Sequence, residues 1–473
     1  MVGRIYFEGQ RVMDHSFRGR ILGVVLLGMI VLADAATLQA QYALPDVPPP
    51  PVVSPDISAD IDELYRRISE LEQKIAETQP AAVSPGPIQL LPPCEGEEPP
   101  PCPFSKCVGY DNGFYLRTCD LNYTLKIRGL FQFRHYADWR NTTVNDEFES
   151  GFVIERAPIL FSGNFISPQL KYWYILQASR ASGTEFLEEG KIIYEFDNGL
   201  QFQAGRFRDP GFLREMEISY ARQLAVERSY YNSVFATGVL EGISLSKQNE
   251  NYRWIAFLND GRNSGFSSRS KDFYQDNADI ALSASTDIKF CGEWAQYGDF
   301  TSWPDEERAS FLRLAMFWEN PEHGDTDPMN DEAGLISYAT EMTYESHGFA
   351  AFASFVGRHS LVEGQDINQF GSMCQVSYQV IPNHGEPFMR YEHIWFDGFT
   401  DVGSGITPVN DSTLNILAAG FNWYFHRQGL KFTIEAMHAF DEIPFSSPNT
   451  GFLIDEPGES GQTVLRSQIQ LFF

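Results

Sequence analysis

Residues 125–140 read LKIRGLFQFRHYADWR, and this stretch decides the fold class. Apolar and polar side chains alternate through it with a period of two, and one of the two faces is basic. The run is far longer than the roughly 5–6 residues of a typical globular strand. The same alternation returns at 157–165 and 170–177. Long strands with one apolar and one polar face are typical of transmembrane β-barrels, where lipid lies outside and water inside.

The composition agrees with a barrel. Aromatic residues make up 14% and hydrophobic residues 43% of the 473 residues, yet the mean hydropathy is only -0.27. Beyond the N-terminal segment, no apolar run approaches the ~18 residues of a membrane helix. A membrane location would therefore require a closed barrel. The formal net charge of -28 argues against nucleic acid as a partner.

The connections between strands fall into two classes. Asp197-Asn198-Gly199 and Arg427-Gln428-Gly429 are tight hairpin signals, whereas connections such as 208–236 and 441–462 are long. Short turns at one end and long loops at the other are characteristic of outer-membrane barrels. We count about 16 candidate strands, a number inside the even series of such barrels, and the stretch 286–310 is the hardest to assign. The alternating C-terminus ending at Phe473 suits a closing barrel strand, with the last strand of a soluble β-sandwich as the alternative.

Residues 1–40 have the pattern of a signal peptide. Four arginines precede an apolar run at 21–33 that is too short to span a bilayer, and a small residue, Ala40, ends the segment. A retained anchor helix is the alternative. Residues 41–79 contain a Pro-rich spacer and then apolar residues at alternating spacings of 4 and 3 from Ile57 to Ile75. This spacing predicts a short coiled coil, with a lone amphipathic helix as the alternative.

A Pro- and Cys-rich linker, 80–124, precedes the predicted barrel domain, 125–473. Its four cysteines are the disulfide candidates Cys94, Cys102, Cys107 and Cys119. In an exported chain, four such cysteines suggest two disulfides with three possible connectivities. A zinc site is the alternative reading, but no Cys-x-x-Cys pair or nearby histidine supports it. Two further cysteines, Cys291 and Cys374, are far apart and are expected to be isolated thiols. We expect no metal and no cofactor.

Residues 205–238 stand out from the strands around them. Pro210 and Gly211 interrupt any regular element, and the stretch mixes five arginines and four acids with apolar residues. We interpret it as a loop folded into the lumen, where fixed charges select solutes; an ordinary solvated surface loop is the alternative. The predicted pore-constriction, anion-guiding residues are Arg206, Arg208, Arg214, Arg222 and Arg228.

Basic residues on the inward phase of the strands are a second candidate group. They are Lys126, Arg128, Arg134, Arg156, Lys171, Arg390 and Arg466. The alternative role for each is simple pairing with lumen acids such as Glu195 and Glu392. No catalytic motif appears, so we do not expect an enzyme. A barrel hydrolase with Ser and His on outward strand positions is the remaining enzymatic alternative.

Residues 205–212, followed by Glu215 and Glu227-Arg228, resemble the loop start of the phosphate-selective porin O and P family. The resemblance covers about 125–473, and the order of signal, helix and barrel is similar to the long form of that family. Here Gly211-Phe212 stand in the reverse order, the chain is strongly acidic, and the lysine-rich anion ladder of the family is not evident. The terminal Phe473 resembles the assembly signal that outer-membrane insertion machinery reads.

The resemblance implies a homotrimeric 16-stranded barrel in the outer membrane of a bacterium, with the N-terminal segment periplasmic. The expected function is passive diffusion of small hydrophilic solutes, with a preference for anions or phosphate. Outer-membrane lipid and small ions are the implied partners. An envelope-tethering protein, whose plugged barrel serves only as an anchor, is the alternative function.

Overall fold

The computed structural model describes residues 107–141, 146–178, 185–262, 278–321, 333–362, 365–402, 405–408, 412–447, 449–456 and 458–473. The chain divides into two compact units, 1–97 and 98–473, and every described residue belongs to the second. The expected signal peptide, the coiled-coil helix, Cys94 and Cys102 lie outside the described residues.

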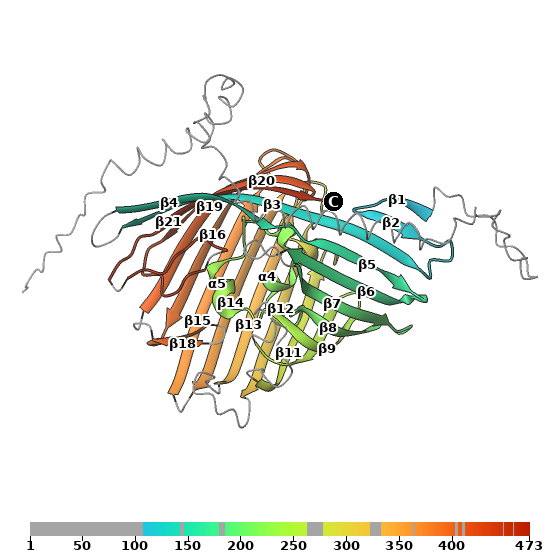
Figure 1. Ribbon diagram of the computed structural model, residues 1–473, viewed down its shortest axis with the longest axis horizontal. Helices are drawn as coiled ribbons and strands as arrows, with labels where there is room; N and C mark the ends of the chain where they lie inside the picture. Colours follow the sequence, from blue (N-terminus) through green and yellow to red (C-terminus); the bar gives the residue numbers. More distant parts are fainter. Residues whose placement is uncertain are drawn as a thin grey trace, which may run out of the picture. The chain divides into compact units, whose positions relative to one another are not determined.

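Sixteen antiparallel strands form a closed ring in this described part, when β4 and β5 are counted as one strand interrupted at Ala157 and Pro158. The strands are β3 (Thr124–Asn141), β4 (Asp146–Arg156), β5 (Ile159–Phe165), β6 (Ser167–Ala178), β7 (Glu185–Glu195), β8 (Leu200–Arg208), β9 (Val239–Gln248), β10 (Tyr252–Asn259), β11 (Ala278–Cys291), β12 (Ala309–Pro321), β13 (Ala333–Ser346), β14 (Phe349–Val362), β15 (Gln365–Tyr378), β16 (Gly385–Phe396), β19 (Ser412–His426), β20 (Leu430–Ala439) and β21 (Thr463–Phe472). Each pairs with its neighbour along the ring, and β21 pairs with β3 to close it (Figure 1). The predicted all-β barrel of about 16 strands is confirmed.

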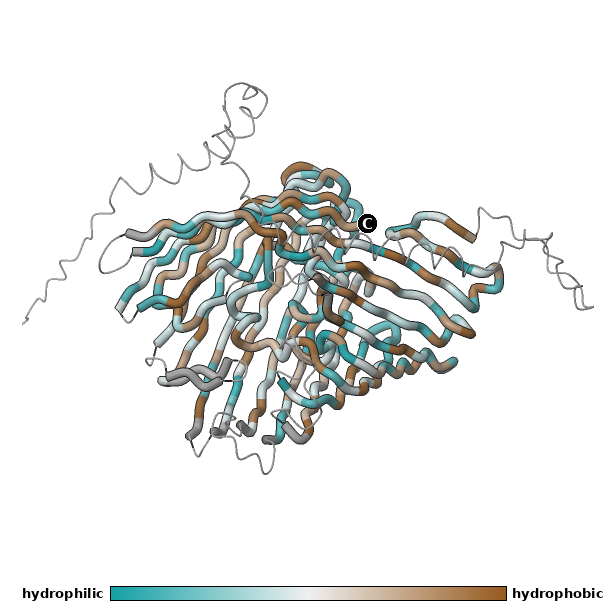
Figure 2. The backbone as a smooth tube through the Cα atoms, viewed as in Figure 1, coloured by the Kyte–Doolittle hydropathy of each residue, from teal (hydrophilic) through white to brown (hydrophobic). Residues whose placement is uncertain are grey.

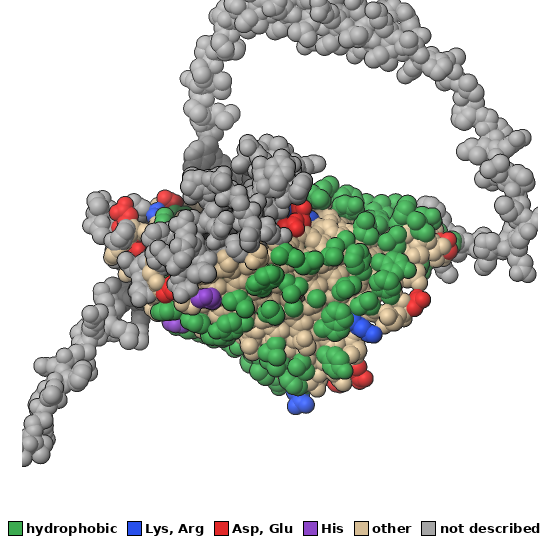
Figure 3. Space-filling model, turned by 90° about the horizontal axis from the view of Figure 1, so that it is seen from below, with side chains coloured by type: hydrophobic (Ala, Val, Ile, Leu, Met, Phe, Trp, Pro, Cys, Tyr) green, Lys and Arg blue, Asp and Glu red, His purple; other side chains and the backbone are tan. Residues whose placement is uncertain are grey.

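The outer face of the ring is apolar and the inner face is polar. In β3, Phe131 and Phe133 are 39% and 37% exposed, whereas Gln132 and Arg134 are fully buried on the inner side. Figure 2 shows hydrophobic and hydrophilic residues alternating along the strands, and Figure 3 shows hydrophobic side chains spread over the outer surface. Exposed apolar surface of this extent marks a contact with lipid or another chain. Alternation with apolar residues outward is the pattern of a barrel that spans a membrane.

The two ends of the barrel differ as the turn signals predict. Gly199 and Gly348 lie in tight hairpins with φ of +78° and +90°, a conformation that glycine adopts without steric cost. The C-terminus lies at this short-turn end, because Phe473 exchanges backbone hydrogen bonds with Gly129 near the start of β3. One connection there is long. Residues 292–308, between β11 and β12, contain the 3-10 helix η2 (Gln296–Gly298) and no strand.

The remaining described elements are short. The connection from β8 to β9 contains α4 (Arg214–Glu217), η1 (Tyr220–Arg222) and α5 (Tyr230–Phe235), while β17 (Phe399–Val402) and β18 (Gly405–Pro408) form a hairpin at the long-loop end. A further hairpin, β1 (Val108–Tyr110) and β2 (Phe114–Arg117), precedes the barrel and pairs with β3. None of the helices described is long and apolar enough to cross a membrane.

Two of the four linker cysteines fall in the described part. Cys119 is disulfide-bonded. The sulfur of Cys107 lies 3.8 Å from the sulfur of Cys119. Cys291 and Cys374 are free thiols, as expected. The connectivity of the four linker cysteines stays a prediction.

Candidate functional site: the lumen of the barrel

Residues 209–238, which we call the internal loop, leave β8 and return to β9 at almost the same point. The amide of Asp209 donates to the carbonyl of Gly238 at 3.0 Å. The Asp209 carboxylate accepts hydrogen bonds from Gly211, Thr237 and Ser283 of β11, at 2.6–2.7 Å. Burial raises the pKa of Asp209, and these hydrogen bonds oppose that rise. The loop is therefore pinned to the wall at its first residue.

The internal loop lies inside the ring (Figure 1). Its apolar side chains pack with apolar side chains of the wall into one hydrophobic core. Phe212 packs against Phe317 of β12 with ring centroids 6.1 Å apart. A Cβ atom on Gly371 of β15 would lie 2.3 Å from the Phe235 ring, so this glycine lets α5 approach the wall closely. Each such aromatic burial contributes about 1.5–3 kcal/mol. The interpretation as a solvated surface loop is excluded by this packing.

Charges also hold the internal loop, because its acids meet arginines of the wall. The ion pairs are Glu227 with Arg134 at 3.0 Å and Arg156 at 2.6 Å, Glu217 with Arg253 at 2.7 Å and Arg313 at 2.6 Å, and Glu215 with Arg390 at 3.9 Å. Burial alone would raise the pKa of Glu227, yet Arg156 and Arg134 hold it below its usual range. At Glu215 burial prevails over Arg390, and its pKa is raised.

Other wall cations bind the backbone of the internal loop. Arg358 donates to the carbonyls of Val234 and Phe235 at 2.8 Å, and Lys431 donates to the carbonyl of Gln223 at 2.8 Å. The lumen-facing candidates Arg134, Arg156 and Arg390 therefore do point inward, but they are engaged with the loop. Arg466, also inward, pairs with Glu435 of the neighbouring strand.

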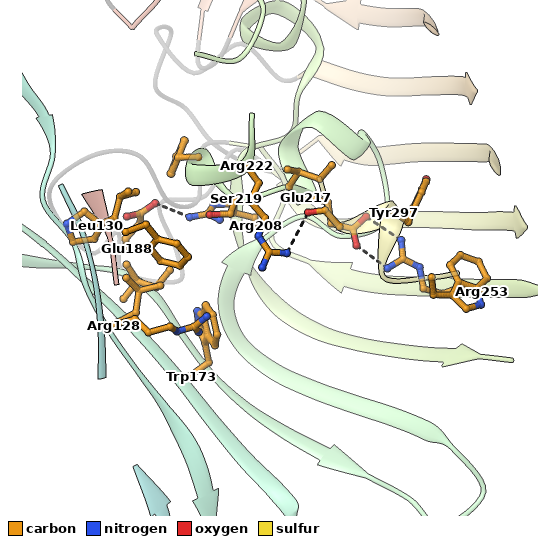
Figure 4. Close-up of a pocket in the computed structure, with 18 of the residues that line it drawn as sticks. Arg128, Leu130, Trp173, Glu188, Arg208, Glu217, Ser219, Arg222, Arg253 and Tyr297 are labelled. Carbon is orange, nitrogen blue, oxygen red and sulfur yellow. Dashed lines mark hydrogen bonds and ion pairs between the residues drawn. The ribbon is translucent and has the colours of Figure 1, made fainter. Parts of the chain in front are cut away.

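A cavity of about 320 Å³ remains between the internal loop and the wall; residues of β3, β5 to β10 and β21 and of the segment 292–308 line it. We call it the lumen cavity. Four arginines and two glutamates line it: Arg128, Arg208, Arg222, Arg253, Glu188 and Glu217 (Figure 4). Hydrophobic and aromatic side chains, including Trp173, Tyr220 and Tyr297, complete the lining.

The four arginines differ in how they are compensated. Arg208 pairs with Glu188 and Glu189 at 3.2 and 3.0 Å, and Arg253 is held by the carboxylates described above. Arg128 lies 4.6 Å from the Trp173 ring centroid, a cation–π contact. The Arg222 guanidinium donates to the carbonyl of Gly298 at 3.5 Å. Within the described residues, neither Arg128 nor Arg222 has a carboxylate within salt-bridge distance.

The other three predicted constriction arginines do not line the lumen cavity. Arg206 pairs at 3.2 Å with Glu241, which is on the same outward phase of β9 as the exposed Ile243 and Leu245. The register pairs Arg206 with Gly190 and Glu241, and two residues further along those strands are the exposed Ile192 and Ile243, so Arg206 lies on the outward phase. Arg208, the last residue of β8, departs from this alternation and reaches Glu188 and Glu189. The prediction that Arg206 lines the constriction is corrected here: its side chain does not line the lumen cavity.

The side chains of Arg214 and Arg228 are engaged with backbone carbonyls. Arg214 donates to the carbonyls of Tyr297 and Asp299 at 3.1 and 2.6 Å and lies over the rings of Tyr297 and Phe300. Arg228 donates to three carbonyls of the helical turn around α4, those of Glu215, Met216 and Ile218. Arg214 thus ties the internal loop to residues 292–308, and Arg228 fastens the backbone within the loop, because buried carbonyls need donors.

Residues 292–308, which we call the mouth segment, cover part of the lumen at the short-turn end. Phe300 and Trp303 are almost fully buried, and Trp303 packs at 5.0 Å against the ring of Tyr424 in β19. The hydroxyls of Thr301 and Tyr424 lie 3.1 Å apart. Sequence reasoning missed this segment. Its one signal is an aromatic at every third position, Trp294, Tyr297, Phe300 and Trp303.

The mouth segment places one titratable acid beside the lumen cavity. Burial raises the pKa of Asp299 to about 6, while Arg222 and Arg214 act to lower it and Glu386 to raise it. The charge of Asp299 therefore interacts with that of Arg222. Near neutral pH Asp299 is ionised and offsets part of the positive charge of Arg222.

The last two candidates, Lys126 and Lys171, lie near the short-turn end. Lys126 pairs with Asp111 at 3.7 Å, and Lys171 pairs with Glu195 at 2.7 Å. Phe473 packs against Phe114 of the N-terminal hairpin with ring centroids 6.4 Å apart.

Known structures match the described fold at low sequence identity. An anion-selective porin from Comamonas acidovorans is 12% identical with a TM-score of 0.52, over 74% of this chain and all of that one. OmpF of Salmonella typhi is 11% identical with a TM-score of 0.49, over 75% of this chain and 100% of its own. The channel DcaP of Acinetobacter baumannii, 9% identical, has a TM-score of 0.47 over 75% of this chain and 99% of its own. The first match shows that the fold is that of a porin barrel. No family model matches the sequence, and no curated protein does either.

Proposed function

We propose that this protein is an outer-membrane porin that lets small hydrophilic solutes diffuse passively, with a preference for anions. The observation that carries the proposal is the lumen cavity. Among the described residues, Arg128 and Arg222 have no carboxylate within salt-bridge distance there, whereas inward arginines such as Arg134, Arg156 and Arg313 are paired. A barrel open to water on its inner face is the architecture that conducts solutes across an outer membrane.

The acidic balance of the whole chain does not oppose an anion preference. Two unit charges 4 Å apart interact by about 4 kcal/mol at an effective dielectric of ~20, against about 1 kcal/mol in bulk water. Charges on the rim are screened within roughly 8–10 Å at physiological salt. Low-dielectric walls also focus the field of the arginines that line the lumen cavity. A small local excess of positive charge therefore decides which ions enter.

The finer assignments belong to the same proposal. The loop residues 205–212 and the order of the segments support membership of the phosphate-selective porin O and P family. We propose with it a homotrimer in the outer membrane, a periplasmic N-terminal segment and Phe473 as an assembly signal.

Planar-bilayer recording tests the proposal. In a salt gradient, the wild-type protein should give a reversal potential with the sign expected for an anion-selective channel. The double variant Arg128→Glu, Arg222→Glu should invert that sign and leave single-channel conductance of the same order. Arg427→Glu is the matched control, since Arg427 lies in a turn of the same end, 56% exposed and paired with Asp305 outside the cavity. An unchanged reversal potential in the double variant would contradict the site.

A plugged anchor is the second candidate function. The internal loop and the mouth segment fill much of the lumen with packed apolar side chains, which favours it. A folded barrel with heat-modifiable gel mobility and no conductance at any voltage would establish the anchor in place of the porin.

A further inference from the structure

The wall of the lumen cavity carries an apolar patch that lies outside the hydrophobic core. Its residues are Leu130, Leu160 and Ile175, on the inward phase of β3, β5 and β6, and all three line the cavity. They are buried, yet none belongs to the core that the internal loop forms with the wall. We call these three residues the apolar patch. Their side chains give the cavity a surface that offers no hydrogen bond.

The strand register places the apolar patch beside Arg128. Arg128 is directly opposite Leu160, which is in turn directly opposite Ile175. Side chains paired in this way have Cβ atoms about 4.5–5.5 Å apart. A guanidinium and two branched apolar side chains therefore form one row across three neighbouring strands.

Arg128 is held in place without losing its charge. Its guanidinium lies 4.6 Å from the centroid of the Trp173 ring, and a ring, unlike a carboxylate, leaves the formal charge uncancelled (Figure 4). The buried Nε of Arg128 has no hydrogen-bond acceptor in the part of the chain that the structure describes. Since buried donors in folded proteins are nearly always satisfied, we expect this one to be met by a bound group.

The acids of the lining do not cancel the charge of Arg128. They are Glu188 and Glu217, and each is paired with other arginines, as described above. The charge of Arg222, across the cavity, acts on that of Arg128. Asp299 does not line the cavity and offsets only part of the charge of Arg222. Positive charge therefore remains directly beside the apolar patch.

We propose that the lumen cavity selects small organic anions with an apolar body, such as aromatic or branched-chain carboxylates, over inorganic anions such as phosphate. The carboxylate binds Arg128 and Arg222, and the apolar body lies on the apolar patch. A phosphate that enters a confined site needs hydrogen bonds on every side, which the apolar patch does not offer. The volume of about 320 Å³ is at the small end of ligand pockets, ~300–1,000 Å³, so the anion is small. This inference rests on the proposed function, because it names the anions that the porin admits.

Titration calorimetry of the full protein in lipid nanodiscs tests the site, with benzoate as the probe. Benzoate should bind at least ~10-fold more tightly than phosphate or acetate, which lack the apolar body, and than benzyl alcohol, which lacks the charge. Arg128→Gln should weaken the binding of benzoate and acetate alike.

Two variants of the apolar patch isolate its contribution. Leu160→Gln should weaken benzoate binding about 10-fold and leave acetate affinity unchanged, because it removes only apolar surface. Glutamine already occupies inward positions of this barrel, such as Gln132 and Gln470. Ile175→Thr keeps the branched shape of the side chain and should weaken benzoate binding about 3-fold.

The matched control is Lys126→Gln. Lys126 lies two residues from Arg128 on the same face of β3, but it pairs with Asp111 and does not line the lumen cavity. This variant should leave benzoate affinity unchanged. Phosphate or acetate binding as tightly as benzoate, unaltered benzoate affinity in both variants of the apolar patch, or an equal loss in Lys126→Gln would each overturn the inference.

This inference and the porin proposal fail separately. Anion selectivity in the bilayer without discrimination between benzoate and acetate would keep the porin and end the inference. A barrel that binds benzoate on the apolar patch but conducts no ions would keep the binding site and end the porin proposal.

Discussion

The interface of the internal loop with the wall and the lumen cavity use the same residue type in opposite ways. At the interface, Arg134, Arg156 and Arg313 have carboxylates at 2.6–3.0 Å. In the lumen cavity, Arg128 and Arg222 have none at that distance among the described residues. A buried ion needs a partner because desolvation costs several kcal/mol. Only beside open space does a cation stay available to a passing solute, so burial separates structural arginines from functional ones.

The largest predicted effect comes from breaking the interface. Glu227→Gln removes the charge that compensates both Arg134 and Arg156, which are otherwise buried. Removing one partner of a buried ion pair costs about 3–5 kcal/mol. We expect a clear fall in the temperature at which the folded band is lost on semi-native gels, together with noisy channel current as the loop loosens.

The control for this variant is Glu241→Gln, because Glu241 is 48% exposed and its pair with Arg206 contributes about 1 kcal/mol or less. Equal melting of the two variants would show that the interface pairs do not hold the internal loop.

A smaller effect is expected from pH, through Asp299. Burial raises its pKa to about 6, so the carboxylate is charged at pH 7.5 and largely neutral at pH 5. As pH falls through 6, Arg222 loses its counter-charge and the anion preference should increase. Reversal potentials at the two pH values measure the change. Asp299→Asn should show the low-pH preference at both, and a wild-type reversal potential that is independent of pH would rule out this coupling.

The smallest effect should come from Arg206. This side chain pairs with Glu241 on the outward phase and does not line the lumen cavity. Arg206→Gln should therefore leave the reversal potential unchanged, whereas Arg222→Gln should reduce the anion preference. A comparable shift in both variants would place Arg206 in the pore after all and restore the original prediction for it.

The sequence by itself determined the barrel. A period of two is a local property, so residues 125–140 predict the strand and its two faces without knowledge of its neighbours. The tight turns at Gly199 and Arg427-Gln428-Gly429, and the long connection after Arg208, are likewise local signals. They set the asymmetry of the ends and mark the internal loop.

Only the tertiary structure decided which charges are free. Arg206, Arg208 and Arg222 lie within a stretch of seventeen residues. Arg206 pairs with Glu241 on the outward phase, and Arg208 pairs with Glu188 and Glu189. Arg222 lies in the lumen cavity with no carboxylate at salt-bridge distance among the described residues. Those acids come from other strands, and the mouth segment that brings Asp299 beside Arg222 lies more than seventy residues away in sequence. The electrostatic field in a lumen is the sum of charges that are far apart in the sequence but only a few ångströms apart in space. Local periodicity holds no information about that sum.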